Sequence, residues 1–515
     1  MNSNQPYPKR WKALGVLALS LLIISLDNTI LNTAIPSLRD DLGASGSALQ
    51  WIVDSYLLVF AGLLLTAGCL GDRFGRKRAL QFGLVVFAVG SAASALATSS
   101  EMLTATRALM GVGGAFIMPS TLSIITAIFP AEERGRAIGA WAAVSGLGIV
   151  LGPLAGGALL EAFDWSSVFW INVPIAAFAI VAGMRLIPES RDPQARPLDL
   201  RGAALSIAGL VAVVWAIIEA PERGWTSPTV LAAAGGGAAV LVAFGWWERR
   251  ARYPMLDLEL FRNLRFSAAS ITISLLFAAL LGTVFILTQH LQSVLDYDAL
   301  GAGLRITPLG AGVIVASAAS ARLTDRVGTK VMVAGGMSVI GAGLVTLSTV
   351  TVDSGYGLIA VALAVMGAGI GMTMAPATDA IMGSVPVSHA SIGSAMNDTT
   401  RMVGGALGVA VLGSVLSHGY RDGVEGALTG LPPEAAAAAD SSVGGAVSVA
   451  DRMGPAGDAL RSAADAAFVT GMADAALVAA AVVMAGAVTA ALWLPARAKP
   501  AEPAAEPGAA QPAAA

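Results

Sequence analysis

Long apolar segments constrain this chain more strongly than any other feature of its sequence. A helix of roughly 18 or more apolar residues can cross about 30 Å of hydrocarbon, and such segments recur from residue 13 to residue 494. Hydrophobic residues make up 56% of the 515 positions and charged residues only 13%, which leaves little charge for a water-facing surface. The sequence therefore predicts an all-α polytopic membrane protein.

We identify fourteen of these segments as transmembrane helices. They lie near residues 13–36, 49–70, 79–98, 104–128, 137–160, 167–187, 201–220, 229–247, 267–291, 303–321, 331–350, 356–378, 395–418 and 475–494. An even number of spans places both termini on the same side of the membrane. The first segment is too long for the apolar region of a signal peptide and lacks a small-residue cleavage site, so we expect it to remain as the first helix.

The basic residues orient the predicted helices. Alternate connections carry 23 Lys and Arg residues, whereas the opposite connections carry only five, three of them in the long segment 419–470. Connections rich in Lys and Arg stay on the cytoplasmic side of the membrane. Both termini are therefore predicted to be cytoplasmic.

Two pairs of short motifs indicate that the chain contains a duplicated half. The segment GDRFGRK (71–77) is echoed by TDRVGTK (324–330), and MGVGG (110–114) is echoed by MGAGI (366–370). The two offsets are nearly equal and exceed the length of six helices, so we expect an inserted pair of helices between two six-helix halves. The predicted division is a cytoplasmic segment at 1–12, a first half at 13–187, the inserted pair at 188–265, a second half at 266–494 and a disordered tail at 495–515.

The segment 419–470 is the one large connection outside the predicted spans. Its apolar residues Leu460, Ala463, Ala464, Ala467 and Phe468 recur at helical spacing. We expect a short amphipathic helical hairpin that lies against the outer face. A flexible Ala- and Gly-rich linker is the alternative.

The connection between the second and third helices combines glycines with charges. In GCLGDRFGRKRAL (68–80), Gly68 and Gly71 allow close helix approach and Gly75 allows a tight turn. Asp72 can exchange charge-assisted hydrogen bonds with the basic cluster Arg73, Arg76 and Lys77. A basic cytoplasmic loop without a special role would explain the charges, but not the glycine spacing or its echo at Asp325, Arg326 and Gly328.

The fifth predicted helix carries a glycine face. Gly148, Gly152 and Gly156 are spaced by four residues, with Gly157 beside them, so a neighbouring helix can approach closely. Pro153 removes a backbone donor and favours a kink. Plain helix packing is the alternative to a specialised role.

Several motifs together resemble one family of transporters. The loop 68–80 resembles the signature loop of the major facilitator superfamily, and LDNTILNTAIP (26–36), TATRALMGVGGAFIMPS (104–120) and SGLGIVLGPLAGGALL (145–160) resemble motifs of its 14-helix drug:proton antiporters, over residues 10–495. The quaternary-ammonium and multidrug resistance exporters of the actinobacterial type are the members most similar to this pattern. In that family the glycine face of the fifth helix is the antiporter motif, which keeps the cavity sealed against leak.

The resemblance implies an exporter driven by the proton-motive force. Its substrates would be hydrophobic, cationic drugs, biocides or antibiotics, moved by alternating access across the inner membrane of a bacterium. The coupling ion would be H⁺, with no other cofactor and no metal, and the protein would function as a monomer within the lipid bilayer.

Ionisable residues inside the predicted spans are the candidate functional groups. A charge at the centre of a membrane helix costs about 2.5–3.5 kcal/mol and is usually functional. The candidates are Asp27, Asp54, Arg107, Asp398 and Arg401, and the polar residues Asn28, Asn32 and Tyr56 are further candidates for lining a substrate cavity.

These charged residues suggest different roles. Asp27 is interpreted as a proton carrier that faces the central cavity, and Arg107 as the cation that tunes it, with a fixed structural ion pair as the alternative. Asp54 and Asp398 are either acceptors for cationic substrates or structural groups. Asp398 and Arg401 are three residues apart and can pair on one helical face.

The sequence also disfavours several other classes of protein. It contains no Gly-x-x-x-x-Gly-Lys-Ser/Thr loop for ATP, and its three histidines and one cysteine show no metal-ligand or catalytic spacing, so an ATP-driven pump or an enzyme is not expected. The net charge of −3 gives no indication of a nucleic-acid partner. A proton-coupled importer or an exporter of one specific metabolite is the main alternative, and a transport-inactive sensor or scaffold is a second one.

Overall fold

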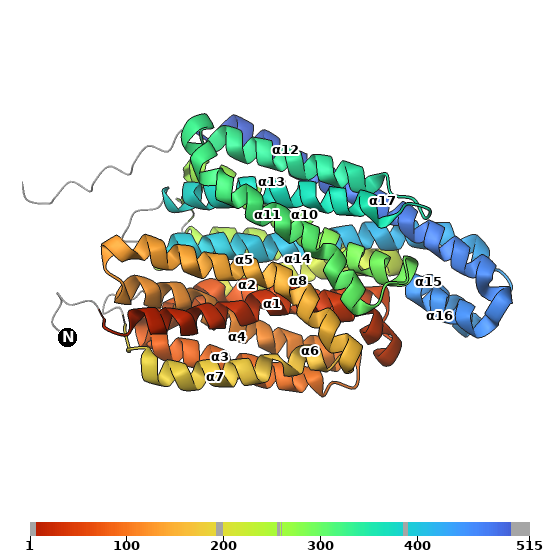
Figure 1. Cartoon of the computed structure of the whole chain (residues 1–515), viewed down its shortest axis with the longest axis horizontal. Helices are drawn as coiled ribbons and strands as arrows, with labels where there is room; N and C mark the ends of the chain where they lie inside the picture. The colour runs from red at the N-terminus through yellow and green to blue at the C-terminus, as the bar shows by residue number, and fades with distance from the viewer. Residues whose placement is uncertain (1–6, 192–198, 255–257, 259, 385–389, 496–515) are drawn as a thin grey trace, which may run out of the picture.

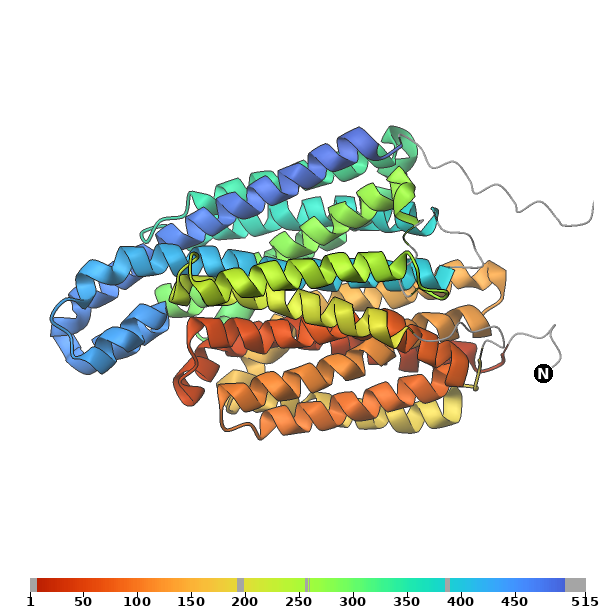
Figure 2. The ribbon, with the colours of Figure 1, turned by 180° about the vertical axis from the view of Figure 1, so that it is seen from behind.

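Long helices that run side by side form the protein. The computed structural model describes residues 7–191, 199–254, 258, 260–384 and 390–495. The start of the first helix and the end of the last helix lie at one end of the bundle, here called the terminal end (Figures 1 and 2). The short helices α15 (Pro433–Ser441) and α16 (Val443–Met453) project at the opposite end, here called the cap end.

Apart from α15 and α16, the α-helices fall into three sets along the chain. The first set is α1 (Arg10–Leu42), α2 (Gly46–Phe74), α3 (Arg76–Ala95), α4 (Ser100–Ile128), α5 (Ala131–Ala162), α6 (Ser167–Trp170) and α7 (Asn172–Leu186), called the N-terminal group. The second is α8 (Leu200–Arg223) and α9 (Pro228–Glu248). The third is α10 (Leu264–Gln289), which continues as a π-helical turn at His290–Val294, then α11 (Ala299–Val327), α12 (Thr329–Ser348), α13 (Tyr356–Met382), α14 (Ala390–Val424) and α17 (Asp458–Trp493), called the C-terminal group.

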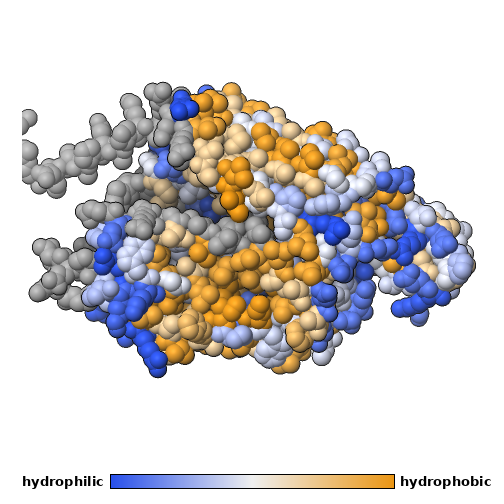
Figure 3. All heavy atoms as spheres, in the orientation of Figure 1, coloured by the Kyte–Doolittle hydropathy of each residue, from blue (hydrophilic) through white to orange (hydrophobic). Residues whose placement is uncertain are grey.

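The helices are of the length and composition that a bilayer requires. In the described part of the chain, thirteen helical segments are long and apolar enough to cross a membrane. Each of the fourteen apolar segments expected from the sequence coincides with helix over most of its length, including the one in α5, where several side chains are outside the description. The segments 79–98, 167–187, 331–350 and 475–494 extend one to three residues past the last helical residue, and 167–187 is divided between α6 and α7 at Ile171. Figure 3 shows a hydrophobic band over the middle of the bundle and hydrophilic residues at both ends. Helices suit this band because each satisfies its own backbone hydrogen bonds.

Two seams join the N-terminal and C-terminal groups. Helix α5 packs against α11 on one side of the molecule, and α2 packs against α14 on another. Helices α8 and α9 pack on each other, and α8 also contacts both α2 and α14. Helix α8 therefore covers the α2–α14 seam from outside.

The structure confirms that the two Asp-Arg-x-Gly motifs form the same turn. Gly75 separates α2 from α3 with a φ of 122°, and Gly328 separates α11 from α12 with a φ of 86°. Residues that carry a side chain rarely adopt a positive φ, so both turns require a glycine. The equivalence supports a duplicated half.

The second motif pair also occupies equivalent places. A Cβ atom on Gly111 of α4 would lie 2.6 Å from the carbonyl oxygen of Tyr56 in α2, and a Cβ atom on Gly367 of α13 would overlap the carbonyl oxygen of Leu309 in α11. Each glycine thus lets the fourth helix of its group contact the second helix backbone to backbone.

The segment 419–470 is more helical than the sequence suggests. Helix α14 continues to Val424 and α17 already begins at Asp458, so Leu460 and Phe468 belong to a long helix and not to a separate hairpin. Only α15 and α16 form the short helical pair, and Tyr420 of α14 donates a hydrogen bond to the carbonyl oxygen of Ala439 in α15 at 2.8 Å. The flexible-linker alternative is wrong for this region.

Candidate functional site

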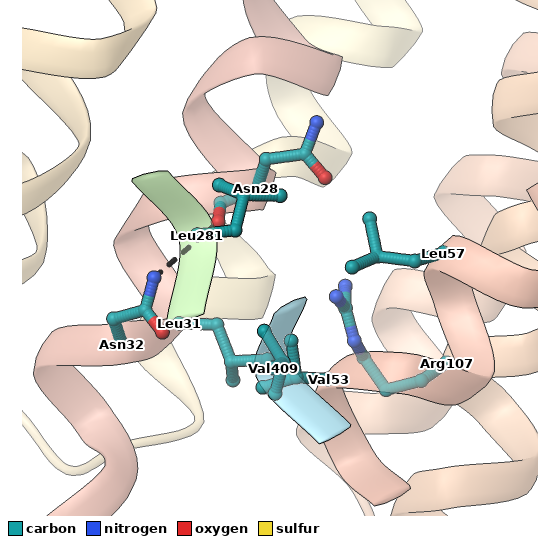
Figure 4. Close-up of a pocket in the computed structure, with 8 residues that line it drawn as sticks. All are labelled: Asn28, Leu31, Asn32, Val53, Leu57, Arg107, Leu281 and Val409. Carbon is teal, nitrogen blue, oxygen red and sulfur yellow. Dashed lines mark hydrogen bonds between the residues drawn. The ribbon is translucent and has the colours of Figure 1, made fainter. Parts of the chain in front are cut away.

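A narrow pocket lies where the N-terminal and C-terminal groups meet, midway along the helices. It is lined by Asn28, Leu31 and Asn32 of α1, Val53 and Leu57 of α2, Arg107 of α4, Leu281 of α10 and Val409 of α14. Arg107 enters it from one side and the residues of α1 line the opposite side (Figure 4). In this state the pocket has room for about one water molecule. The predicted cavity residues Asn28 and Asn32 therefore do line a pocket, although it is contracted.

An ion pair lies directly behind this pocket. Nη1 of Arg107 is 2.5 Å from Oδ2 of Asp27, and each residue is only 1% exposed. The Nε of Arg107 also donates to the carbonyl oxygen of Ile52 in α2 at 3.2 Å. The pair joins α1 to α4 across 80 residues of sequence. Because Arg107 both pairs with Asp27 and lines the pocket, the charge on Asp27 contributes to the electrostatic potential inside the pocket.

Two further side chains complete the surroundings of this ion pair. The Nδ2 of Asn172, the first residue of α7, donates to Oδ1 of Asp27 at 3.2 Å and lies 3.2 Å from Oγ of Ser91 in α3. Both oxygens of the Asp27 carboxylate therefore have a partner. Asn172 was not identified as a site residue from the sequence. Its position within an apolar segment could have indicated it, because a carboxamide there requires a polar partner.

Tyr56 acts on Arg107 from outside the pocket. Its ring lies 4.4 Å from the guanidinium carbon of Arg107, which is within the range of a cation–π contact. The side chain is fully buried and does not line the pocket. The structure therefore does not place Tyr56, a candidate cavity residue, in the lining of this pocket, and its ring lies against the guanidinium of Arg107 instead.

Asp54 is a buried carboxylate that the pocket does not include. It lies on α2 and its side chain is 0% exposed, and neither carboxylate oxygen has a hydrogen-bond partner among the described residues. It is one residue from Val53, which lines the pocket. A buried carboxylate without a hydrogen-bond partner is costly, so Asp54 does not contribute to stability through a polar contact in this state.

Asp398 and Arg401 form a separate cluster inside the C-terminal group. Nη1 of Arg401 is 3.9 Å from Oδ1 of Asp398, a loose pair on α14. Arg401 also donates to Oγ1 of Thr378 in α13 at 3.0 Å, and its guanidinium lies 5.4 Å from the ring of Phe277 in α10. The structure does not bring this cluster into the lining of the pocket.

The loop between α2 and α3 is held by contacts within its own group. Nε of Arg76 is 2.7 Å from Oδ1 of Asp72, and its Nη1 donates to the carbonyl oxygen of Ser123 in α4 at 3.2 Å. Nζ of Lys77 donates to the carbonyl oxygen of Met184 in α7 at 2.8 Å. Gly68 and Gly71 face α4 and α3, as their spacing predicts. Arg73 lies over its neighbour Phe74.

The equivalent loop of the C-terminal group is described only in part. Its glycine turn at Gly328 is present and Arg326 is exposed. The side chain of Asp325 lies outside the described residues.

The glycine face of α5 packs against α1, the helix that carries Asp27. Side chains of α1 occupy the places where side chains on these glycines would be: Ser25 at Gly148, Thr29 at Gly152 and Thr33 at Gly156. Thr29 also donates to the carbonyl oxygen of Gly148 at 3.1 Å. Helix α5 continues through Pro153. The close approach expected from the glycine spacing is confirmed.

Gly157 faces a different helix from the other three glycines. A Cβ atom there would overlap the backbone of Leu300 in α11, and a Cβ atom on Gly303 would overlap the carbonyl oxygen of Pro153. These contacts, and a hydrogen bond of 2.9 Å from Gln292 to the carbonyl oxygen of Thr33, join the two groups in the half of the bundle nearer the cap end.

The chain matches known transporters over most of its length. Residues 17–409 match the family model for the Major Facilitator Superfamily. The multidrug efflux pump LfrA of Mycolicibacterium smegmatis is 38% identical over 92% of this chain and 94% of its own. The tetracenomycin C resistance and export protein of Streptomyces glaucescens is 33% identical over 92% of this chain and 89% of its own.

Solved structures show the same fold at lower identity. A bacterial homologue of the human lysosomal transporter Spinster, in an inward-facing and unoccupied conformation, superposes with a TM-score of 0.65. Its sequence is 17% identical, and the superposition covers 94% of this chain and 98% of the other. At this identity the likeness concerns the fold alone.

Proposed function

The chain belongs to the Major Facilitator Superfamily, and on that premise we propose that it is an efflux transporter driven by the proton gradient. Its substrates are hydrophobic compounds, mainly cations, that enter the pocket between the two groups of helices. One observation carries the proposal: a buried carboxylate, Asp27, is paired with a guanidinium, Arg107, that also lines this pocket. The efflux pumps among its relatives support the direction of transport.

The ion pair provides a way to make proton binding and drug binding compete. When Asp27 is ionised, it neutralises Arg107, and a cationic drug can approach the pocket. When Asp27 takes up a proton, the positive charge of Arg107 is no longer balanced and repels a cation. A proton from outside therefore drives the drug off its site, and release of that proton to the cytoplasm prepares the site for the next drug.

The topology that we propose is six helices, two inserted helices and six more, with both termini in the cytoplasm. The repeat of the glycine turns supports it, as does the location of the start of α1 and the end of α17 at the terminal end. The terminal end is then cytoplasmic and the cap end faces outward. The contacts of Gly157, Gly303 and Gln292 support a state that is closed toward the outside.

Transport by the purified protein tests this function. Proteoliposomes that contain the protein are loaded with ethidium, and a pH gradient is imposed. We expect gradient-driven transport of ethidium with opposite movement of protons, and loss of both when a protonophore is added. Ethidium transport that continues unchanged with the protonophore would contradict proton coupling.

Neutralising the other two buried carboxylates separates binding roles from structural ones. We expect Asp54→Asn to slow ethidium transport by roughly tenfold more than transport of the uncharged dye Nile Red, because a buried carboxylate favours a cation only. The effect of Asp398→Asn should be smaller, since Arg401 already partly balances that charge. The exposed Asp353 provides a control, Asp353→Asn. Equal losses for both dyes would indicate structural roles.

The loop between α2 and α3 is proposed to stabilise one end state of the transport cycle. We expect Asp72→Asn to lower turnover by roughly ten- to a hundredfold, the effect of losing a hydrogen bond to a charged group of about 1.5–3 kcal/mol in one state. Drug affinity should stay nearly unchanged. Asp325→Asn should be milder, because its loop has Thr324 and Thr329 in place of Gly71 and Arg76. Equilibrium binding and transport measured on the same variants decide this, and a large loss of affinity with normal turnover would contradict it.

A further inference from the structure

A second cavity lies on the α2–α14 seam, nearer the cap end than the pocket. Along α2, Val53 and Leu57 line the pocket and Gln50 lines the second cavity. Along α14, Val409 lines the pocket and Ser417 the second cavity. The same two helices therefore line both cavities, and a separation of α2 from α14 would join them.

This second cavity, here called the cap chamber, has walls from both groups of helices and a roof. Its walls include Gln50 of α2, Phe285 and Gln289 of α10, Ser417 and Tyr420 of α14, and Phe468 of α17. Residues 441–443, where α15 meets α16, lie over it. The roof is held on both sides, because Tyr420 donates to α15 and a Cβ atom on Gly46 of α2 would lie 3.1 Å from the carbonyl oxygen of Ser441.

The lining of the cap chamber is polar but carries no charge. Its polar groups are carboxamides and hydroxyls, and two phenylalanine rings provide apolar surface. Gln50 is only 2% exposed, and its Oε1 has no hydrogen-bond partner among the described residues. A buried polar atom without a hydrogen-bond partner is costly. A water molecule that donates to Oε1 of Gln50 would relieve this cost, and so would a ligand that takes the place of that water and donates in the same way.

The same lining discriminates between classes of ligand. A permanent cation that enters the cap chamber loses its hydration, and no carboxylate among the lining residues replaces it. An uncharged molecule with carbonyl or hydroxyl groups can exchange hydrogen bonds with Gln50, Gln289 and Tyr420. Its aromatic body can pack against Phe285 and Phe468.

We propose that the cap chamber is a second ligand subsite, which holds uncharged aromatic molecules bearing carbonyl or hydroxyl groups on their way out of the pocket. The proposal rests on the proposed export function. It adds that charged and uncharged substrates use different parts of one path, with cations held at the level of Asp54 and uncharged molecules held one helical turn further toward the cap end, at Gln50.

Equilibrium binding to the full chain in lipid nanodiscs tests the subsite without requiring transport. The 2-hydroxy derivative of Nile Red, abbreviated to Nile Red in this test, serves as the uncharged probe, because its hydroxyl group can donate to Oε1 of Gln50. Ethidium serves as the cationic probe, and the signal from empty nanodiscs is subtracted. In the double variant Gln50→Leu with Gln289→Leu, we expect the Kd for Nile Red to rise about tenfold, the effect of losing one or two hydrogen bonds, and the Kd for ethidium to change less than about twofold. Gln81→Leu, on the half-buried Gln81 of α3 outside both cavities, is the matched control and should change neither.

A charge-introducing variant keeps the test informative if the double variant does not fold. Gln289→Glu places a carboxylate in the cap chamber, so the Kd for Nile Red should rise and the Kd for ethidium should fall. Equal changes for both dyes, or no change in either variant, would overturn the subsite. Failure of the wild-type protein to couple ethidium transport to protons would instead overturn the export function, and these binding measurements would be unaffected.

Discussion

Replacing Asp27 by Asn should abolish transport driven by the pH gradient, with a loss of at least about a hundredfold in the initial rate of ethidium efflux. The amide has nearly the same shape as the carboxyl group but cannot carry a proton, so the coupling step is lost. It also leaves the guanidinium of Arg107 buried without its counter-charge, which costs about 3–5 kcal/mol in such pairs. The rate is measured in proteoliposomes with matched amounts of folded protein.

Two further variants separate the loss of coupling from the loss of stability. The double variant Asp27→Asn with Arg107→Gln removes both charges, so it should regain thermal stability without regaining coupled transport. Asp41→Asn, on an exposed carboxylate of the same helix, should leave both properties unchanged. Gradient-driven efflux by the double variant at the wild-type rate would show that the pair is structural, which is the alternative reading of these two residues.

The helices could be predicted from the sequence because each apolar segment exceeds the thickness of a bilayer. Their ends could not be predicted, since the apolar pattern and the helix end at different residues: α14 extends beyond its apolar segment, whereas α3 ends before its segment does. Helix α14 runs on past residue 418 to Val424 because Tyr420 and Val424 are buried against neighbouring elements at the cap end. The short helix α16 begins at a local signal, Ser442, whose side chain accepts a hydrogen bond from the backbone of Gly445.

The candidate site was predictable where a motif contains a charge within an apolar segment. Asp27 and Arg107 meet this condition, and the structure joins them. Asn172 was missed because its contact with Asp27 spans 145 residues and depends on the rotation of α7. Asp54 and Asp398 meet the same condition as Asp27, yet neither lines the pocket in this state. A charged residue within a transmembrane segment is thus a candidate functional residue, but the sequence does not determine which of these residues share a site.

The rotation of a helix about its axis also determines which neighbouring helix its glycines contact. Spacing alone predicted that Gly148, Gly152 and Gly156 share a face, and they pack against α1. Gly157 is their neighbour in sequence, but it points toward α11 in the C-terminal group. The first three glycines therefore bind two helices of one rigid group together, whereas Gly157 lies at a contact that must open and close if the two groups move.

Replacing Gly157 by Val should hold the two groups apart at the cap end and lower turnover by at least about tenfold. A Cβ atom at this position would lie 2.6 Å from the carbonyl oxygen of Ala299 and would overlap the backbone of Leu300. Backbone atoms cannot move aside as a flexible side chain can, so α5 and α11 must separate. Each 1.4 kcal/mol that this clash adds to the closed state shifts the ratio of closed to open states tenfold toward the open one.

Labelling of a cysteine between the two groups measures this shift directly. In a Cys69→Ser background, Gln292→Cys places the reporter where Gln292 now donates to α1, and a membrane-impermeant maleimide reports its access from outside. Labelling should rise several-fold when Gly157→Val is added. It should not rise with Gly235→Val in α9, where a Cβ atom meets nothing within 4 Å. If transport is lost while labelling stays at the background level, the substitution has damaged packing within the groups, and the contact between α5 and α11 is not the closure that faces the outside.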